Sequence, residues 1–237
     1  SKSRTFGEQI MDWNQFFFVV FPYISFTLFV VVTIYRLVYR PFTQSSLSSQ
    51  LLERKRLYWG SIPFHHGITW ILLFHLLALV FPKAILFLNA VPLRLYLLEL
   101  SGFALGLWAL VGVVILIWRR ITTPYIKAVT TTMDIVVLLL TLVSMITGVL
   151  TASLYRFGSV WFTGVFTPYL WSVLLFQPRP ELVTPLPWLI QLHLVNNFII
   201  LAVFPFSRLV HILALPLDYL IRPWQLVIGM RDRKTVK

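Results

Sequence analysis

Four histidines lie in apolar stretches of the chain, where their residue type and spacing are those of metal ligands. His65 and His75 are ten residues apart in one stretch, and His193 and His211 are eighteen apart in another. An imidazole buried in a bilayer is costly unless it binds something. Two helices that each carry two such imidazoles can clamp two flat metal cofactors between them.

The composition predicts an integral membrane protein. The 237 residues are 58% hydrophobic and only 12% charged, which is more apolar surface than a soluble fold of this length needs. The chain has no cysteine, and this excludes disulfides, thiolate-held iron–sulfur clusters and covalently attached c-type haem. Histidine is therefore the expected ligand of a redox cofactor, with methionine a weaker candidate. The net charge of +12 indicates basic cytoplasmic loops and contact with anionic lipid or a partner, and we expect no nucleic acid.

Five apolar runs are long enough to cross about 30 Å of hydrocarbon as helices, and we expect one membrane domain over residues 1–237. The predicted spans are residues 15–35, 61–81, 96–118, 134–155 and 186–213. A further apolar run at 157–178 is interrupted by glycine and proline, and we expect it to lie at the membrane interface. Residues 214–237 are expected to form a cytoplasmic tail. The first residues lack the apolar region and cleavage site of a signal peptide.

The distribution of Lys and Arg predicts the orientation of the spans. Residues 36–60 carry five of them, residues 119–133 carry three and the segment from 208 onward carries six, whereas the other three segments carry two each. This alternation fits five spans with the N-terminus outside and the C-terminus in the cytoplasm. A sixth span at 157–178 would put the most basic tail outside. The sequence therefore predicts an all-α integral membrane fold with five transmembrane helices.

In this orientation the four histidines form two pairs by depth. His65 lies near the inner end of the second span, and His75 lies about 15 Å farther out. The fifth span runs the other way, which places His193 toward the outside and His211 near the inner end. We expect His75 and His193 to hold an outer haem b, and His65 and His211 an inner one, between spans two and five. A straight helix would separate His193 from His211 by about 27 Å, so we expect Pro205 to kink it and shorten that reach.

Other roles for the histidines stay open at this point. One intramembrane histidine more often makes a helix–helix hydrogen bond than a metal bond, although four in depth-matched pairs favour ligands. Zinc or copper is a weaker option, because spacings of ten and eighteen do not gather side chains around one ion. His66 lies about 100° around the helix from His65, so we assign it no ligand role. A transporter or passive anchor is the competing class, but no span carries paired charges.

Motifs along nearly the whole chain, from about Asn14, resemble the gamma subunit family of respiratory nitrate reductase. These motifs are FFF and PYI (Phe16–Phe18, Pro22–Ile24), SSQLLERK (Ser48–Lys55), FHHG (Phe64–Gly67), RR (Arg119, Arg120), A-x-T-T-x-x-D (Ala128–Asp134), LHLV (Leu192–Val195) and FPFSRLVHI (Phe204–Ile212). The last motif is long and specific. Both histidine spacings also match the family pattern.

The resemblance implies a five-helix anchor of a prokaryotic cytoplasmic membrane that binds two b haems. It implies the same ligands as the depth pairing, namely His65 with His211 and His75 with His193. It also implies that quinol is oxidised near the outer haem and that its protons leave on the outer side. Electrons would then pass through the inner haem to an iron–sulfur beta subunit and to a molybdenum-containing alpha subunit that reduces nitrate. This chain alone would not reduce nitrate.

Two positions depart from the family pattern where the quinol site is expected. Tyr96 stands where the family has a lysine, and Phe74, just before His75, stands where a glycine is familiar. Polar candidates for this region are Lys83, Arg94, Tyr96 and Glu99. An altered or absent quinol site would suit the alternative function, a homologous di-haem subunit of a nitrite oxidoreductase-type or other molybdoenzyme complex.

Charged residues at the expected inner surface have two possible roles. Arg208, Arg119 and Arg120 could pair with haem propionates, or could be headgroup and topology contacts. Asp134 is expected to be an N-terminal helix charge.

The inner face is also expected to dock the iron–sulfur subunit. The candidate contacts are the loop at Arg54–Arg56 and the tail at 222–237. Its apolar stretch Trp224–Ile228 is expected to be a docking strip or to lie on the membrane.

Overall fold

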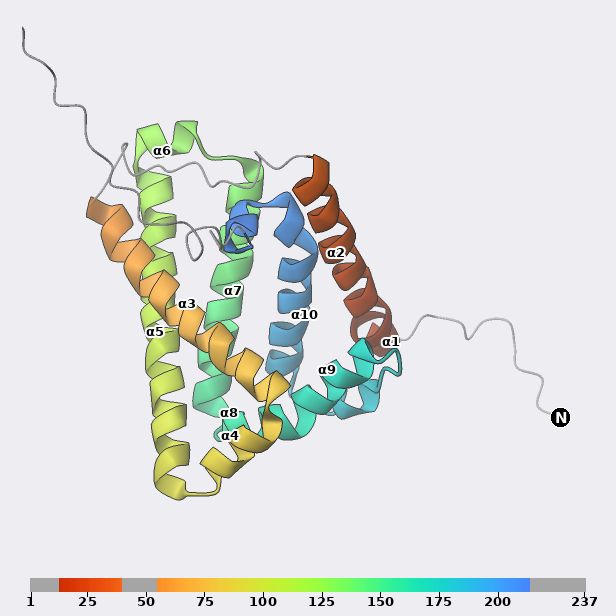
Figure 1. The fold of residues 1–237 in the computed structure, drawn as a ribbon. Helices are drawn as coiled ribbons and strands as arrows, with labels where there is room; N and C mark the ends of the chain where they lie inside the picture. The colour runs from red at the N-terminus through yellow and green to blue at the C-terminus, as the bar shows by residue number, and fades with distance from the viewer. Residues whose placement is uncertain (1–12, 40–54, 214–237) are drawn as a thin grey trace, which may run out of the picture.

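The computed structural model describes residues 13–39 and 55–213, and within these ranges every regular element is helical (Figure 1). Five helical stretches are long and apolar enough to cross a membrane. They are Trp13–Tyr39, Lys55–Val80, Pro92–Thr122, Thr132–Leu154 and Trp188–Phe206. The prediction of an all-α fold with five candidate spans is therefore confirmed.

The spans consist of the following helices. The first joins α1 (Trp13–Gln15), a π-helical turn (Phe16–Val20) and α2 (Phe21–Tyr39), and the others are α3 (Lys55–Val80), α5 (Pro92–Thr122), α7 (Thr132–Leu154) and α10 (Trp188–Val203). Helices α3 and α5 extend beyond the predicted spans at their polar ends. Hydropathy marks only the part of a helix that suits hydrocarbon, whereas the backbone hydrogen bonds continue into the charged ends.

Proline and a capping box determine where the long helices begin. Helix α5 starts at Pro92, where the missing N–H would have had no helical partner in any case. It ends before the short helix α6 (Pro124–Ala128), because the residue before a proline disfavours helical backbone. Helix α7 opens with Thr131, whose Oγ1 accepts from the Asp134 N–H at 3.2 Å, while Asp134 Oδ2 accepts from the Thr131 N–H at 3.0 Å.

The long helices pack in the order α3, α5, α7, α10 and α2, each against the next (Figure 1). Helix α3 runs obliquely to the others and makes little contact with α10 in the described part of the chain. Its contact with α5 is close, because a Cβ on Gly112 would lie 2.5 Å from the Phe64 nitrogen and one on Gly67 would lie 2.7 Å from the Leu105 oxygen. Small residues allow such close approach between membrane helices.

One end of the bundle, here called the capped end, is crossed by the capping segment, residues 158–174. This segment consists of α8 (Gly158–Trp161), a π-helical turn (Phe162–Phe166) and α9 (Thr167–Leu174), and in Figure 1 it lies across the lower end beside α4 (Pro82–Asn89). It is not among the helices that are long enough to span. The placement of residues 157–178 at a membrane surface stays a prediction.

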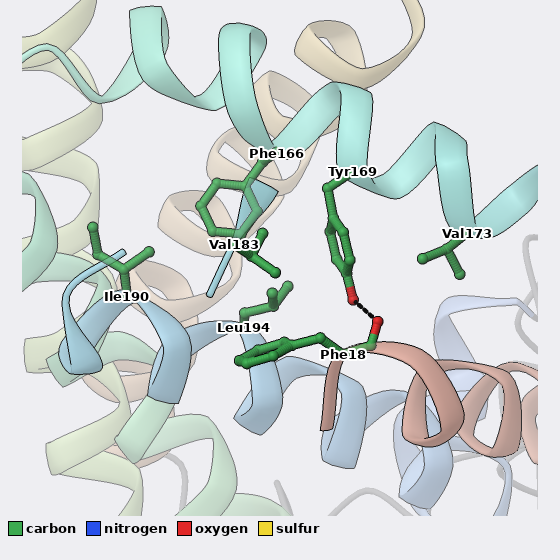
Figure 2. Close-up of a cluster of buried hydrophobic side chains, with 7 residues drawn as sticks. All are labelled: Phe18, Phe166, Tyr169, Val173, Val183, Ile190 and Leu194. Carbon is green, nitrogen blue, oxygen red and sulfur yellow. Dashed lines mark hydrogen bonds between the residues drawn. The ribbon is translucent and has the colours of Figure 1, made fainter. Parts of the chain in front are cut away.

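A cluster of buried side chains joins the capping segment to the bundle (Figure 2). Its members are Phe18, Phe166, Tyr169, Val173, Val183, Ile190 and Leu194. The Tyr169 hydroxyl donates to the Phe18 carbonyl at 2.8 Å, as Figure 2 shows. Burial raises the pKa of Tyr169, so the neutral donor is the form that this cluster favours.

The opposite end of the bundle, here called the basic end, holds arginines in the last turns of α2 and α5 and at the start of the turn that carries His211. They are Arg36, Arg119, Arg120 and Arg208. The side of the membrane that this end faces stays a prediction. Arg54, the tail at 222–237 and its apolar stretch Trp224–Ile228 lie outside the described residues.

Candidate functional site

The fifth span is not one helix through residue 213 as expected. Helix α10 ends at Val203, and two 3-10 turns follow, Phe204–Phe206 and Arg208–Ile212. Between them Ser207 has extended backbone, with φ −107° and ψ 179°. Pro205 has no N–H to continue the helical ladder, so it ends the α-helix where a kink was expected. This break turns the chain before His211.

The break brings His211 close to His65. The centroids of the two imidazole rings are 6.3 Å apart, and the ring planes are inclined by 62°. Metal–imidazole bonds of about 2 Å place the centroids of two rings on opposite sides of one ion about 6 Å apart. The separation therefore fits two axial ligands of a single iron.

Hydrogen bonds orient both rings of this basic-end pair. His65 Nδ1 lies 2.8 Å from the Ser61 carbonyl oxygen and 3.0 Å from Ser61 Oγ. His211 Nδ1 lies 2.6 Å from the carbonyl oxygen of Arg208. A carbonyl only accepts, so each Nδ1 donates to it, and in the neutral ring the lone pair then lies on Nε2, the atom that can bind a metal.

In the capped-end pair each Nδ1 also lies within hydrogen-bond distance of a fixed oxygen. His75 Nδ1 donates to the Ile71 carbonyl at 2.7 Å, and His193 Nδ1 lies 2.8 Å from Thr147 Oγ1 on α7. Phe162 of the capping segment packs its ring against His75, with centroids 4.9 Å apart at 90°. The capping segment is therefore in direct contact with this pair.

The donor set suits a metal that brings most of its own ligands. In the stretches that the structure describes, no three His, Cys, Asp or Glu side chains gather to hold an ion. A haem iron needs only two axial protein ligands, since its porphyrin supplies the rest. His66 is set apart from the pairs, because its ring stacks on Trp108 with centroids 6.0 Å apart and planes inclined by 26°.

Asp134 forms ion pairs with two of the three arginines that are candidates for haem propionates. Arg120 NH1 lies 3.1 Å from Asp134 Oδ2, and Arg208 Nε lies 3.0 Å from Asp134 Oδ1. Arg119 is 3% exposed at the same end of α5. Asp134 is thus a helix-capping charge, as the sequence indicates, and also an ion-pair partner that the sequence did not reveal. Contacts of the three arginines with propionates stay a prediction.

Arg36 supports the same turn from α2. Its NH1 donates to the carbonyl oxygens of Pro205 and Ser207, the latter at 3.3 Å. The turn that carries His211 is therefore held from two sides, by α2 and by the start of α7.

The residues that are expected to line a quinol site differ from one another in exposure and contacts. Tyr96 is 61% exposed, and its ring centroid lies 6.2 Å from that of Phe157, just before the capping segment. Lys83 is exposed on α4, and Phe74 is half-buried on α3. Glu99 has a structural role, because its carboxylate accepts from the N–H groups of Gly158 and Ser159 at 3.0 and 2.8 Å.

Comparison with known proteins gives the family. The family model of the nitrate reductase gamma subunit matches residues 14–230. The chain belongs to this family. The resemblance seen in the sequence motifs is confirmed.

This gamma subunit has relatives that it matches along nearly their whole length. The nitrate reductase gamma chain of Bacillus subtilis is 32% identical over 215 residues, which cover 89% of this chain and 96% of the relative. The respiratory nitrate reductase 1 gamma chain of Escherichia coli is 32% identical over 220 residues, with 90% and 96% covered. The corresponding 2 gamma chain is 31% identical over 224 residues, with 92% and 98% covered. These relatives are gamma chains of nitrate reductases.

Sequence reasoning missed the residues of α7 that touch the gamma subunit's histidine site. Thr147 binds His193, and a Cβ on Gly148 would lie 3.2 Å from His193 Cε1. Threonine and glycine are common in membrane helices, so neither stood out.

Proposed function

We propose that this gamma subunit is the membrane cytochrome b of a quinol–nitrate oxidoreductase complex, with two b haems held by its paired histidines. The observation that carries the proposal is the 6.3 Å separation of the His65 and His211 rings, both with Nδ1 already bonded. His75 and His193 offer a second pair of Nε2 atoms at the capped end. Bound haem would supply one-electron transfer, and two imidazoles on each iron would leave no axial position for oxygen.

The proposed direction of electron flow follows from the charge of the loops. The basic end is proposed to face the cytoplasm of a prokaryotic cell, since basic loops are retained on that side. Quinol, as menaquinol or ubiquinol, is proposed to bind near His75 at the capped end and to release its protons outside. Electrons then leave at the basic end to an iron–sulfur beta subunit, which passes them to a molybdenum-containing alpha subunit that reduces nitrate.

The protein's own residues have separate tasks in this proposal. His65, His75, His193 and His211 bind iron through Nε2. Arg208, Arg119 and Arg120 are proposed to stabilise propionate charge at the basic end, where guanidinium groups already gather around Asp134. Tyr96, Phe74 and Lys83 are proposed to line the approach of quinol.

A second candidate function is favoured by Phe74 and Tyr96. These bulky aromatic residues replace the glycine and lysine of the family pattern near His75. A homologous di-haem subunit of a nitrite oxidoreductase-type or other molybdoenzyme complex would have such a changed quinol site. Added menaquinol should reduce the haems, with a block by a quinol-site inhibitor, if the first function holds. Haems that menaquinol does not reduce would favour the second function.

Haem content and single replacements test the proposal. We expect two low-spin b haems in the purified complex. His75→Ala or His193→Ala should remove one of the two electron paramagnetic resonance signals, and His65→Ala or His211→Ala the other. His66→Ala is the matched control and should keep both signals, since its ring stacks on Trp108. A colourless chain, or one with a single haem, would overturn the proposal.

A further inference from the structure

His193 differs from the other three histidines in what its Nδ1 contacts. His65, His75 and His211 bond to backbone carbonyls three or four residues earlier in their own segments, and His65 also contacts the Ser61 hydroxyl of its own helix. His193 instead bonds to a side-chain hydroxyl on a different helix, Thr147 of α7, at 2.8 Å. The orientation of this one ring therefore depends on the packing of two helices.

The bonds of Thr147 fix the direction of this contact. Thr147 is 4% exposed, and its Oγ1 lies 2.7 Å from the Val143 carbonyl oxygen and 3.2 Å from that of Ser144. A hydroxyl has one proton, and a carbonyl can only accept it. Oγ1 must then accept from His193, so Nδ1 carries the proton and Nε2 is the atom left for iron.

Gly148, the next residue of α7, has no side chain and so leaves space for the His193 ring. A Cβ at this position would lie 3.2 Å from His193 Cε1 and 3.8 Å from its Nδ1. That separation is tighter than most real Cβ contacts, so the ring would have to turn or shift. The imidazole therefore packs directly against the backbone of α7.

Further polar contacts hold α10 in register with α7 around His193. Ser144 Oγ donates to Asn197 Oδ1 at 2.9 Å, and Asn197 Nδ2 donates to the His193 carbonyl at 2.7 Å. Asn196 Nδ2 donates to the Leu140 carbonyl at 3.0 Å. Hydrogen bonds between membrane helices stabilise one relative position of the two helices. Movement of α10 along α7, which would carry the ring away from Thr147, would break the Ser144–Asn197 and Asn196–Leu140 bonds.

We propose that Thr147 and Gly148 are positioning residues for His193 that set the reduction potential of the capped-end haem apart from that of the basic-end haem. The inference rests on the proposed function. An acceptor at Nδ1 makes the imidazole a more electron-rich ligand and so stabilises ferric iron. At His193 this acceptor is a side-chain hydroxyl, which a substitution can remove. At the other three ligands a backbone carbonyl accepts the bond, and a side-chain substitution does not remove it.

Redox titration of the purified complex tests Thr147. Thr147→Val removes the acceptor and keeps the shape, so the potential of the capped-end haem should move to more positive values while that of the basic-end haem stays in place. Thr147→Ser keeps the hydroxyl and should restore the original potential. Thr151→Val is the matched control, because Thr151 is 7% exposed on the same helix and its Oγ1 has no hydrogen-bond partner among the residues that the structure describes. This variant should leave both potentials unchanged.

Gly148→Ala gives an independent measurement. The added methyl group should turn the His193 ring and shift the electron paramagnetic resonance signal of the capped-end haem alone. Two haems with unchanged potentials in Thr147→Val and unchanged signals in Gly148→Ala would overturn this inference while leaving the proposed function intact. An equal shift of both potentials in Thr147→Val would overturn it as well. Absence of haem from the unmodified complex would instead overturn the proposed function.

Discussion

Arg208 and Asp134 form an ion pair, with Arg208 Nε 3.0 Å from Asp134 Oδ1. Arg208 opens the turn that carries His211, and its carbonyl oxygen accepts from His211 Nδ1 at 2.6 Å. Asp134 belongs to the first turn of α7. The ion pair therefore connects the start of one membrane helix to the position of a candidate ligand.

Asp134→Asn should weaken this connection. Asparagine retains helix-capping ability, but the two arginines lose the charge that they share, and the Asp134 side chain is only 8% exposed. We expect a loss of about 1–3 kcal/mol of stability, as for a largely buried charged group that loses its partner. Thermal unfolding in detergent measures this loss of stability. The absorption spectrum should also show that less haem is retained at the basic end than at the capped end.

Arg179→Gln provides the control for Asp134→Asn. Arg179 pairs with Glu181 at 3.3 Å, but the two side chains are 61% and 64% exposed, so the pair is expected to contribute little. Equal effects of the two variants would contradict a special role for Asp134.

Gly112→Val should push α3 away from α5. A Cβ at Gly112 would lie 2.5 Å from the Phe64 nitrogen, and backbone cannot move aside as a side chain can. Overpacking of this kind costs about 1–3 kcal/mol, so the variant should unfold at a lower temperature. His65 follows Phe64 directly, and haem binding at the basic end should weaken as well.

Gly102→Ala on the same helix is the matched control for Gly112→Val. Within residues 13–39 and 55–213, a Cβ at Gly102 meets no atom within 4 Å. Alanine is favoured over glycine in a helix interior by up to about 1 kcal/mol, so this variant should be neutral or more stable. A destabilised Gly102→Ala protein would mean that glycines of α5 matter for a reason other than close packing.

Glu99→Gln should loosen the capping segment. The carboxylate accepts from the N–H groups of Gly158 and Ser159 and from Ser159 Oγ at 2.7 Å. An amide has one accepting oxygen in place of two, so at least one of these bonds is lost at a cost of about 1–2 kcal/mol. Hydrogen exchange of residues 158–174 should become roughly tenfold faster. The exposed Glu181→Gln is the control, and exchange that is equally fast in both variants would contradict the role of Glu99.

The five candidate spans could be predicted because a chain that crosses a bilayer as a helix needs a long apolar segment, and the hydropathy of the sequence shows such segments directly. The depth pairing of the histidines used only the helical rise and the direction of each span. Pro205 predicts a kink in a helix that continues to residue 213, whereas α10 ends at Val203. The position of a proline in the sequence does not predict whether the helix bends or ends there. That depends also on the hydrogen bonds available to the chain after the proline, such as those from Arg36.

The contacts around His193 could not be predicted in the same way. A threonine in a membrane helix commonly bonds to a carbonyl of its own preceding turn, and Thr147 does so with Val143. Its second bond, to His193, depends on the rotation and register of α7 against α10. Those quantities arise from the packing of whole helices. The pairing of Arg208 with Asp134 depends in the same way on the turn that follows α10.

The buried cluster at the capped end gives the molecule two regions with different responses to temperature. Helices inside hydrocarbon gain nothing from excluding water, so close van der Waals packing, as at Gly67 and Gly112, holds them together. The cluster around Tyr169 joins the bundle to the capping segment, which is predicted to lie at the membrane interface, where water exclusion stabilises apolar contact. That contribution has a large heat capacity and weakens on cooling. Cold should therefore loosen the cover over His75 before it affects the bundle that carries the other ligands.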